Sequence, residues 1–345
     1  MLIIATFIIA LLICRSNIKG GIHIAILLFG LLFSMRNDLV PDTIPYRDLF
    51  NQNISLETSS EVGYLYLCYF FHNILGTSFS QFLFVFTVIS MEIWCFITKK
   101  MLPGYQLPML FIGFMSYFGL FYFGIVLRSS LAILTVYWGL TFLIKKSIPG
   151  SIVFILSLGL AFLFHKTSII FLLAFVSLIS YNKYILYTLI GVAILAAITH
   201  PFASIQGQLE LFLGASEEFS KYYSYAMDET LNTGFDAIFT SYVLIGLVGV
   251  YMRKYIGNSE RERVVYNLLL NLYVIGILLD SVMSDFRAGG RLPMQFLYFE
   301  VIIVYMILFK NRKTAKLNAK PLYFTLFMVA KLTLLLHRTP LLLNY

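Results

Sequence analysis

Long apolar runs separated by short polar segments make up almost the whole of this chain. A transmembrane helix needs about 20 mainly apolar residues, with a range of about 17–25, and several of these runs are somewhat shorter. The runs are 2–14, 22–35, 62–76, 79–98, 107–126, 129–144, 151–164, 167–181, 184–199, 237–252, 264–283, 292–309 and 321–336. They are continuous and do not alternate as the strands of a transmembrane β-barrel do. The pattern predicts an all-α, polytopic transmembrane bundle of about 12–13 spans, in which the shorter segments are tilted, broken or re-entrant.

Two longer polar segments, 36–61 and 200–236, interrupt the apolar runs. The second is rich in acidic residues and carries a single lysine, Lys221. Loops poor in basic residues belong on the outer side of a membrane, so we expect both segments there. With no internal repeat and no soluble segment, residues 1–345 are predicted to form one integral membrane domain.

Composition excludes a soluble globular protein. Charged residues make up 12% of the chain and hydrophobic residues 59%, whereas soluble domains carry about 25% charged residues. The net charge of +8 does not indicate nucleic-acid binding, because the basic residues collect in short loops, where they orient transmembrane helices. The three cysteines, Cys14, Cys68 and Cys95, have neither metal-site nor disulfide spacing and are interpreted as apolar fillers.

The basic loops also predict an orientation. With 99–100, 145–146, 253–263 and 310–320 inside, Arg128, His165 and the 285–291 turn fall outside together with 200–236. Segment 36–98 conflicts with this scheme, because 62–76 and 79–98 cannot both be simple crossings if 36–61 is outside. Either 62–76 is a partial or surface helix, or another segment is split.

The strongest cluster of polar residues, SMRNDLVPDTIPYRDLF, ends the second apolar run. Pro41 and Pro45 prevent a regular helix there, although one can begin near Pro45. Asp42 either caps that helix or acts on a substrate as a base. Arg36, at the end of the run, is a candidate for binding a ligand, and Tyr46 lies at the interface.

Three further charged positions stand beside apolar runs, where charge is expensive and therefore a functional candidate. Glu61 opens an apolar run and either suits the N-terminal dipole of its helix or binds a ligand. Arg128 has no acidic neighbour in sequence, so it needs a distant acidic partner or a ligand phosphate. His165 is either an interfacial side chain or part of the same site.

The turn SDFRAGGRLPMQFLYF places Asp285, Arg287 and Arg291 around two glycines. The two arginines either hold a pyrophosphate or pair with the aspartate. The chain has no P-loop, no GxGxxG before a helix, no HExxH and no CxxC, so we expect no cofactor and no metal.

In this order, these elements resemble the EpsG family, polytopic proteins grouped with the Wzy-type polymerases of bacterial surface polysaccharides. The resemblance covers roughly residues 30–310, with two departures: the family usually has Gly-Thr-Asp where this chain has Val-Pro-Asp at 40–42, and often Arg-Gln where this chain has Arg128-Ser129. The elements that carry it are Arg36, Asp42 and Tyr46, then Glu61-Val-Gly-Tyr64, LRSSLA at 127–132, FHKTSII at 164–170 and FRAGGR at 286–291.

The resemblance implies a fold like that of membrane glycosyltransferases with lipid-linked donors. It also implies a multi-pass protein of the bacterial cytoplasmic (inner) membrane that polymerises undecaprenyl-pyrophosphate-linked oligosaccharide repeat units at the outer face. O-antigen, capsule or exopolysaccharide would be the product, with no nucleotide sugar and no nucleic acid. Its expected partners are those lipid-linked oligosaccharides, membrane lipid and, as a further candidate, a chain-length regulator protein.

For that reaction, fixed cations would stabilise the leaving pyrophosphate, and a base would accept the proton of the attacking hydroxyl. Asp42 is the first choice of base and His165 the second. Tyr222, Tyr223 and Tyr225 either stack on sugar rings or are interfacial. The cations expected to act are Arg36, Arg128, Arg287 and Arg291, and Tyr46 and Glu61 are expected at the substrate.

Two other activities fit the same features. One is a glycosyltransferase that adds a single sugar from a polyprenyl-phosphate donor, which product length would distinguish from a polymerase. The other is a flippase for lipid-linked oligosaccharides or a transporter. A transporter favours inverted repeats around a midplane site, whereas the charges here gather at one face.

Overall fold

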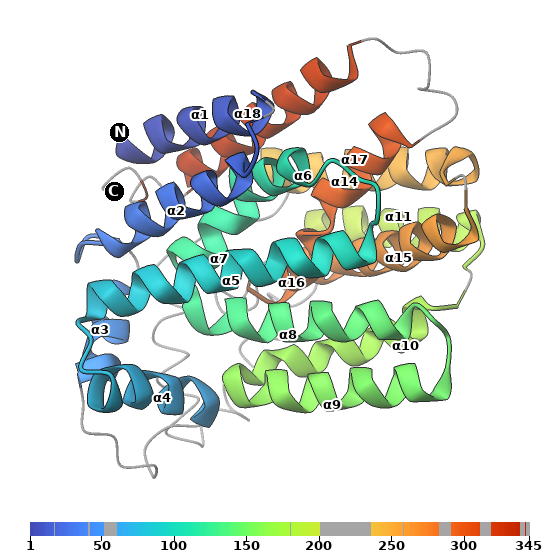
Figure 1. Cartoon of the computed structure of the whole chain (residues 1–345). Coiled ribbons are helices and arrows are strands. Elements are labelled where there is room, and N and C mark those ends of the chain that lie inside the picture. The colour runs from blue at the N-terminus through green and yellow to red at the C-terminus, as the bar shows by residue number, and fades with distance from the viewer. Residues whose placement is uncertain are drawn as a thin grey trace. The chain divides into compact units, whose positions relative to one another are not determined.

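The computed structural model describes most of the chain as helices (Figure 1). The described residues are 1–16, 18–40, 42–51, 61–179, 181–200, 236–257, 259–282, 291–310, 319–338 and 342. Each of the thirteen apolar runs identified in the sequence coincides with a helical segment. The prediction of an all-α polytopic membrane protein is therefore confirmed.

Among the described residues, five helical stretches are long and apolar enough to cross a membrane. These are Phe79–Met101, Leu107–Gly124, Ala237–Tyr255, Glu260–Val282 and Leu292–Phe309. Shorter apolar helices cover Leu2–Arg15, Gly21–Ser34, Leu127–Leu143, Ile148–Phe164, Lys166–Ser177 and Lys183–Thr199. Many leucine, isoleucine and phenylalanine side chains on these helices are exposed, as expected where lipid is the solvent.

The chain divides into two compact units, residues 1–172 with 319–345 (unit 1) and residues 173–318 (unit 2). In unit 1, neighbouring helices pack in the order α1, α2, α5, α8 and α9, while α6 packs on α1 and α18 packs on α6 and η2. The helices of unit 1 are α1 (Leu2–Arg15), α2 (Gly21–Ser34), α3 (Thr43–Asn51), α4 (Val62–Tyr69), η1 (Phe70–Ile74), α5 (Phe79–Met101), α6 (Leu107–Phe114), η2 (Met115–Gly119), α7 (Leu120–Gly124), α8 (Leu127–Leu143), α9 (Ile148–Phe164), η3 (Lys166–Leu172) and α18 (Lys320–Arg338).

Unit 2 is built around α15, which packs against α10, α11, α14, α16 and α17. The buried Asn271 of α15 donates its amide to the backbone carbonyls of Ser177 and Ile179, at 2.8 and 3.1 Å, and so ties the end of α10 to α15. The helices of unit 2 are α10 (Leu173–Ser177), α11 (Lys183–Thr199), α14 (Ala237–Met252), η4 (Arg253–Tyr255), α15 (Glu260–Val282), α16 (Arg291–Leu297) and α17 (Glu300–Phe309).

Segment 62–74 is a short helical stretch, in which the eight residues of α4 continue into the five of η1, about 20 Å in all. It packs beside α3, which is only nine residues or about 13 Å long. Tyr64 in the first turn of α4 contacts Tyr46, with ring centroids 5.6 Å apart, and His72 in η1 contacts Phe50 at 5.1 Å. Phe79, the first residue of α5, contacts the same Phe50 at 5.7 Å.

The short stretch of α4 with η1 agrees with the first of the two alternatives for segment 36–98, in which 62–76 is a partial helix. The beginning of α5 lies beside α3, because Phe79 contacts Phe50. The lysines in the last turn of α5 and directly after α8 lie together, since Lys100 and Lys145 both approach the Phe142 ring, at 4.5 and 5.4 Å. Within unit 1 the lysine loops and Arg128 are thus at opposite ends of α8.

Candidate functional site

Three helix boundaries of unit 1 meet at the end where α3 lies. Glu61 directly precedes α4, Arg128 is in the first turn of α8, and His165 directly follows α9 with an extended backbone. These residues lie at helix ends because α8 begins after a two-residue break from α7 and because η3 begins immediately after His165. The three residues, separated by up to 104 positions in sequence, are brought together by the packing of α4, α8 and α9.

Glu61 binds both of the other residues. Its Oε1 lies 2.7 Å from Nδ1 of His165, and its Oε2 accepts a hydrogen bond from Nη1 of Arg128. The side chains are 10% exposed for Glu61, 17% for His165 and 37% for Arg128. The distant acidic partner that Arg128 requires is therefore Glu61, whose carboxylate makes no capping hydrogen bond to α4.

The electrostatics favour an ionised Glu61. Burial raises the pKa of this carboxyl, but the hydrogen bond from His165 and the positive charge of Arg128 outweigh burial and hold the pKa below its ordinary value of 4.5. Glu61 is therefore a carboxylate at neutral pH. It can only accept hydrogen bonds, which fixes the direction of both contacts.

Gly63 allows the close approach of α4 to the end of α9. A Cβ atom at this position would lie 3.0 Å from the carbonyl oxygen of Leu163 and 3.1 Å from Cδ1 of Phe164. The first turn of α4 therefore rests on the backbone of the last turn of α9. Since Glu61 and His165 flank this contact on their two helices, the missing side chain at Gly63 helps to bring them within hydrogen-bond distance.

Tyr46 joins this cluster to the turn between α2 and α3. Its ring is buried, and the guanidinium carbons of Arg128 and Arg36 lie 5.5 and 5.6 Å from its centroid. Cations at this distance from an aromatic ring are attracted to its π electrons. Tyr46 thus connects α3 with Arg128 of α8.

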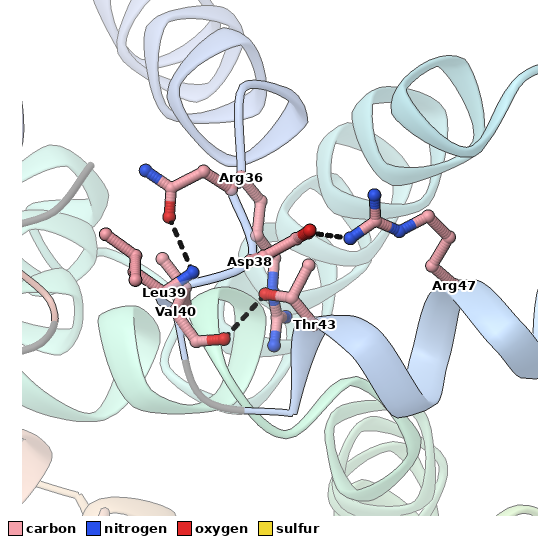
Figure 2. Close-up of polar contacts among 7 residues, drawn as sticks. Arg36, Asp38, Leu39, Val40, Thr43 and Arg47 are labelled. Atoms are coloured by element: carbon pink, nitrogen blue, oxygen red, sulfur yellow. Dashed lines mark hydrogen bonds and ion pairs between the residues drawn. The ribbon is translucent and has the colours of Figure 1, made fainter.

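Arg36 is buried within the turn between α2 and α3 (Figure 2). Its Nε donates to Oγ1 of Thr43 at 2.5 Å, and both terminal nitrogens lie 3.4 Å from the carbonyl oxygen of Ile125, in the break between α7 and α8. The Thr43 hydroxyl in turn donates to the Val40 carbonyl at 2.7 Å. Arg36 therefore ties the α2–α3 turn to the break that precedes Arg128.

Asp42 lies at the start of α3 and is half-buried. Its carbonyl accepts the backbone N–H of Tyr46 at 3.2 Å, so its backbone begins the helix. Its φ of 61° is in the left-handed region that residues other than glycine seldom adopt. Aspartate adopts this conformation more readily than most residues other than glycine, and here it turns the chain into α3.

The remaining predicted residues belong to other parts of the chain. Asp285 and Arg287 lie outside the described residues, as do Tyr222, Tyr223 and Tyr225 of the 200–236 segment. Arg291 is the first residue of α16 in unit 2, and only its backbone is described. The described site therefore consists of Arg36, Asp42, Tyr46, Glu61, Arg128 and His165.

Two buried charged residues were missed by the sequence analysis. Glu300, at the start of α17, is fully buried and accepts a hydrogen bond from the Tyr273 hydroxyl at 3.4 Å. Lys331 of α18 is 2% exposed, and its ammonium lies 5.5 Å from the Tyr117 ring centroid. Each of them is a single charged residue inside an apolar run, and this is the sequence signal by which they could have been found.

The arrangement offers a cation and an imidazole side by side at the end of a helical unit. Arg128 pairs with Glu61 through Nη1, and its side chain is 37% exposed, so the guanidinium can also meet an anion. The N-terminus of α8 has no side-chain cap, and its dipole adds positive potential at the same place. Throughout the described ranges, no three His, Cys, Asp or Glu side chains come together to hold a metal.

Comparison with known proteins assigns the chain to a family. A model of the EpsG family matches residues 22–345, which is nearly the whole chain and includes every residue of the site. No curated protein and no solved structure shows significant similarity to this sequence. The chain therefore belongs to the EpsG family, a family of polysaccharide polymerase-like membrane proteins.

Proposed function

We propose that this protein polymerises undecaprenyl-pyrophosphate-linked oligosaccharide repeat units at the outer face of the bacterial cytoplasmic membrane. The product would be an O-antigen, capsule or exopolysaccharide. Family membership supports the substrate class. The single observation that carries the proposal is the joining of Arg128 and His165 through Glu61, which pairs an anion-binding group with a candidate base.

Arg128 and the first turn of α8 would bind the pyrophosphate of the donor. In the reaction, the bond between the anomeric carbon and the pyrophosphate oxygen breaks while the acceptor oxygen bonds to that carbon. Negative charge on the leaving pyrophosphate grows as this happens. Donors that are already fixed stabilise the growing charge without reorganising, and Arg128 is held in place by Glu61.

A base would accept the proton of the acceptor hydroxyl. His165 and Asp42 are the two candidates, and the structure supports His165 by its place beside Arg128 in the same cluster. Proton transfer to a positioned base contributes about 10²–10⁴-fold to a rate. Arg36 and Tyr46 would support Arg128 from the α2–α3 turn, and Arg287 and Arg291 remain candidates for a second contact with phosphate.

The test is deletion of the gene in its native host, followed by gel and mass-spectrometric analysis of lipid-linked and surface glycans. Complementation uses wild type, Arg128→Ala and Asp42→Asn, with membrane levels checked. Glu92→Gln is the matched control, because Glu92 also pairs with a histidine, His23 at 2.6 Å, on the exposed surface of α2 and α5.

Loss of long chains with single repeat units left over, restored by wild type and by Glu92→Gln but not by Arg128→Ala, supports the polymerase. Repeat units that lack one sugar while chains stay long would instead identify a transferase of single sugars. Accumulation of repeat units only at the cytoplasmic side would identify a flippase and overturn the proposal.

A further inference from the structure

We infer that Glu61 is a positioning residue, which holds His165 in the tautomer that bears its proton on Nδ1 and thereby makes Nε2 the base for the acceptor hydroxyl. The inference rests on the proposed glycosyl transfer and gives Glu61 a role other than substrate binding. It follows from the contacts of one carboxylate with two helix ends.

The tautomer follows from the contact itself. A carboxylate has no proton to donate, so the 2.7 Å contact between Oε1 of Glu61 and Nδ1 of His165 requires the hydrogen to be on Nδ1. In a neutral imidazole the other nitrogen, Nε2, then carries the free electron pair. A histidine in this state can accept a proton at Nε2 without rotating its ring.

The same carboxylate balances the charge after proton transfer. When Nε2 takes the hydroxyl proton, the ring becomes a cation next to Arg128, and two cations repel each other. The Glu61 carboxylate lies between them, with one oxygen on each. At 10% exposure it is poorly screened by water, so its charge acts strongly on both neighbours.

Helix formation does not explain this carboxylate. Glu61 occupies the N-cap position of α4, yet its side chain makes no capping hydrogen bond. The side chain instead turns toward the ends of α8 and α9, and Gly63 leaves room for α9 to approach. A carboxylate turned away from its own helix is better explained by the residues that it orients.

A double-mutant cycle tests the inference in the purified full-length protein. The substrate probe is the pool of lipid-linked repeat units extracted from a host strain that lacks the gene. We would measure kcat and KM of chain extension for wild type, Glu61→Gln, His165→Ala, the double variant and Glu92→Gln. Glutamine keeps the shape of Glu61, but its amide cannot accept hydrogen bonds from both neighbours.

Glu61→Gln is expected to lower kcat by about 10²-fold or more with little change in KM, because general-base catalysis contributes about 10²–10⁴-fold. The double variant should lose less than the product of the two single losses, because without His165 the carboxylate of Glu61 positions Arg128 alone. Glu92→Gln should match wild type. The inference would be overturned if the loss of kcat in the double variant equalled the product of the two single losses, or if Glu61→Gln left kcat unchanged. Either result would leave the proposed polymerase activity intact.

A second measurement needs no Glu61 variant. Nitrogen-15 NMR of histidine-labelled wild-type protein in lipid reports which ring nitrogen carries the proton, and His165→Ala identifies the signal among the five histidines. A protonated Nδ1 supports the inference, and a bare Nδ1 refutes it whatever the variants do. If wild type extends no chain from the extracted repeat units, the proposed function itself fails, and the role of Glu61 in it fails too.

Discussion

Loss of Arg128 should destabilise the protein more than loss of the charge on Glu61, although both changes remove the same ion pair. Arg128→Ala leaves a carboxylate that is only 10% exposed. Breaking a buried pair in this way costs about 3–5 kcal/mol of stability. Because the Arg128 side chain is 37% exposed, water offsets part of this cost, and we expect about 2–3 kcal/mol. Glu61→Gln leaves a guanidinium that water can reach, so we expect about 1 kcal/mol.

The assay is the thermal aggregation midpoint of the purified protein in detergent micelles, compared among wild type, both single variants and the double variant. The double variant should be more stable than Arg128→Ala, because it no longer contains a buried carboxylate that has lost the positive charge of Arg128. Arg47→Ala is the matched control, since its pair with Asp38 is exposed on both sides and should contribute almost nothing. If the stability loss of the double variant equalled the sum of the two single losses, the two residues would not be coupled and this reasoning would be refuted.

Three further outcomes are expected. Gly63→Ala should cost about 1–3 kcal/mol of stability, because the methyl group pushes α4 away from the Leu163 carbonyl. Polymer formation should fall by more than this cost implies, since the contact of Glu61 with His165 becomes longer. Glycan gels at matched membrane levels measure the effect. The stability advantage of wild type over Glu61→Gln should be complete above pH 4.5 and vanish as the pH falls through the lowered pKa of Glu61, which midpoints recorded across acidic buffers would show. Asn271→Leu should cost about 1–3 kcal/mol in the same aggregation assay, because it strands two backbone carbonyls at the end of α10.

The helices could be predicted because the apolar signal is strong and repeated. Local geometry could not be predicted in the same way. The π-helices at 70–74 and 115–119 and the break between Leu297 and Glu300 lie inside apolar runs, where composition does not change. The basic loops show only that 62–76 and 79–98 cannot both be simple crossings if 36–61 is outside. That 62–74 is a short helix packed against Phe50 depends on contacts between distant residues, which the loops do not encode.

The site was predictable as a set of residues but not as a set of contacts. A charge beside an apolar run stands out in any sequence, which is why Glu61, Arg128 and His165 were all identified. Their pairing spans 67 and 104 positions and depends on how α4, α8 and α9 pack, which no local pattern encodes. The role of Gly63 was hidden for the same reason, because a glycine in an apolar run has no visible partner until α9 is placed against it.

The position of the cluster at one end of unit 1 has a chemical consequence. A charged side chain is costly at the bilayer midplane and much less so near the interface, and a lipid-linked pyrophosphate carries its own charge at the level of the head groups. A site at helix ends can therefore meet such a substrate without drawing the phosphates into the hydrocarbon, while the polyprenyl tail stays in the lipid. The first residues of α4 contribute to this site, because Glu61 directly precedes α4 and meets the ends of α8 and α9.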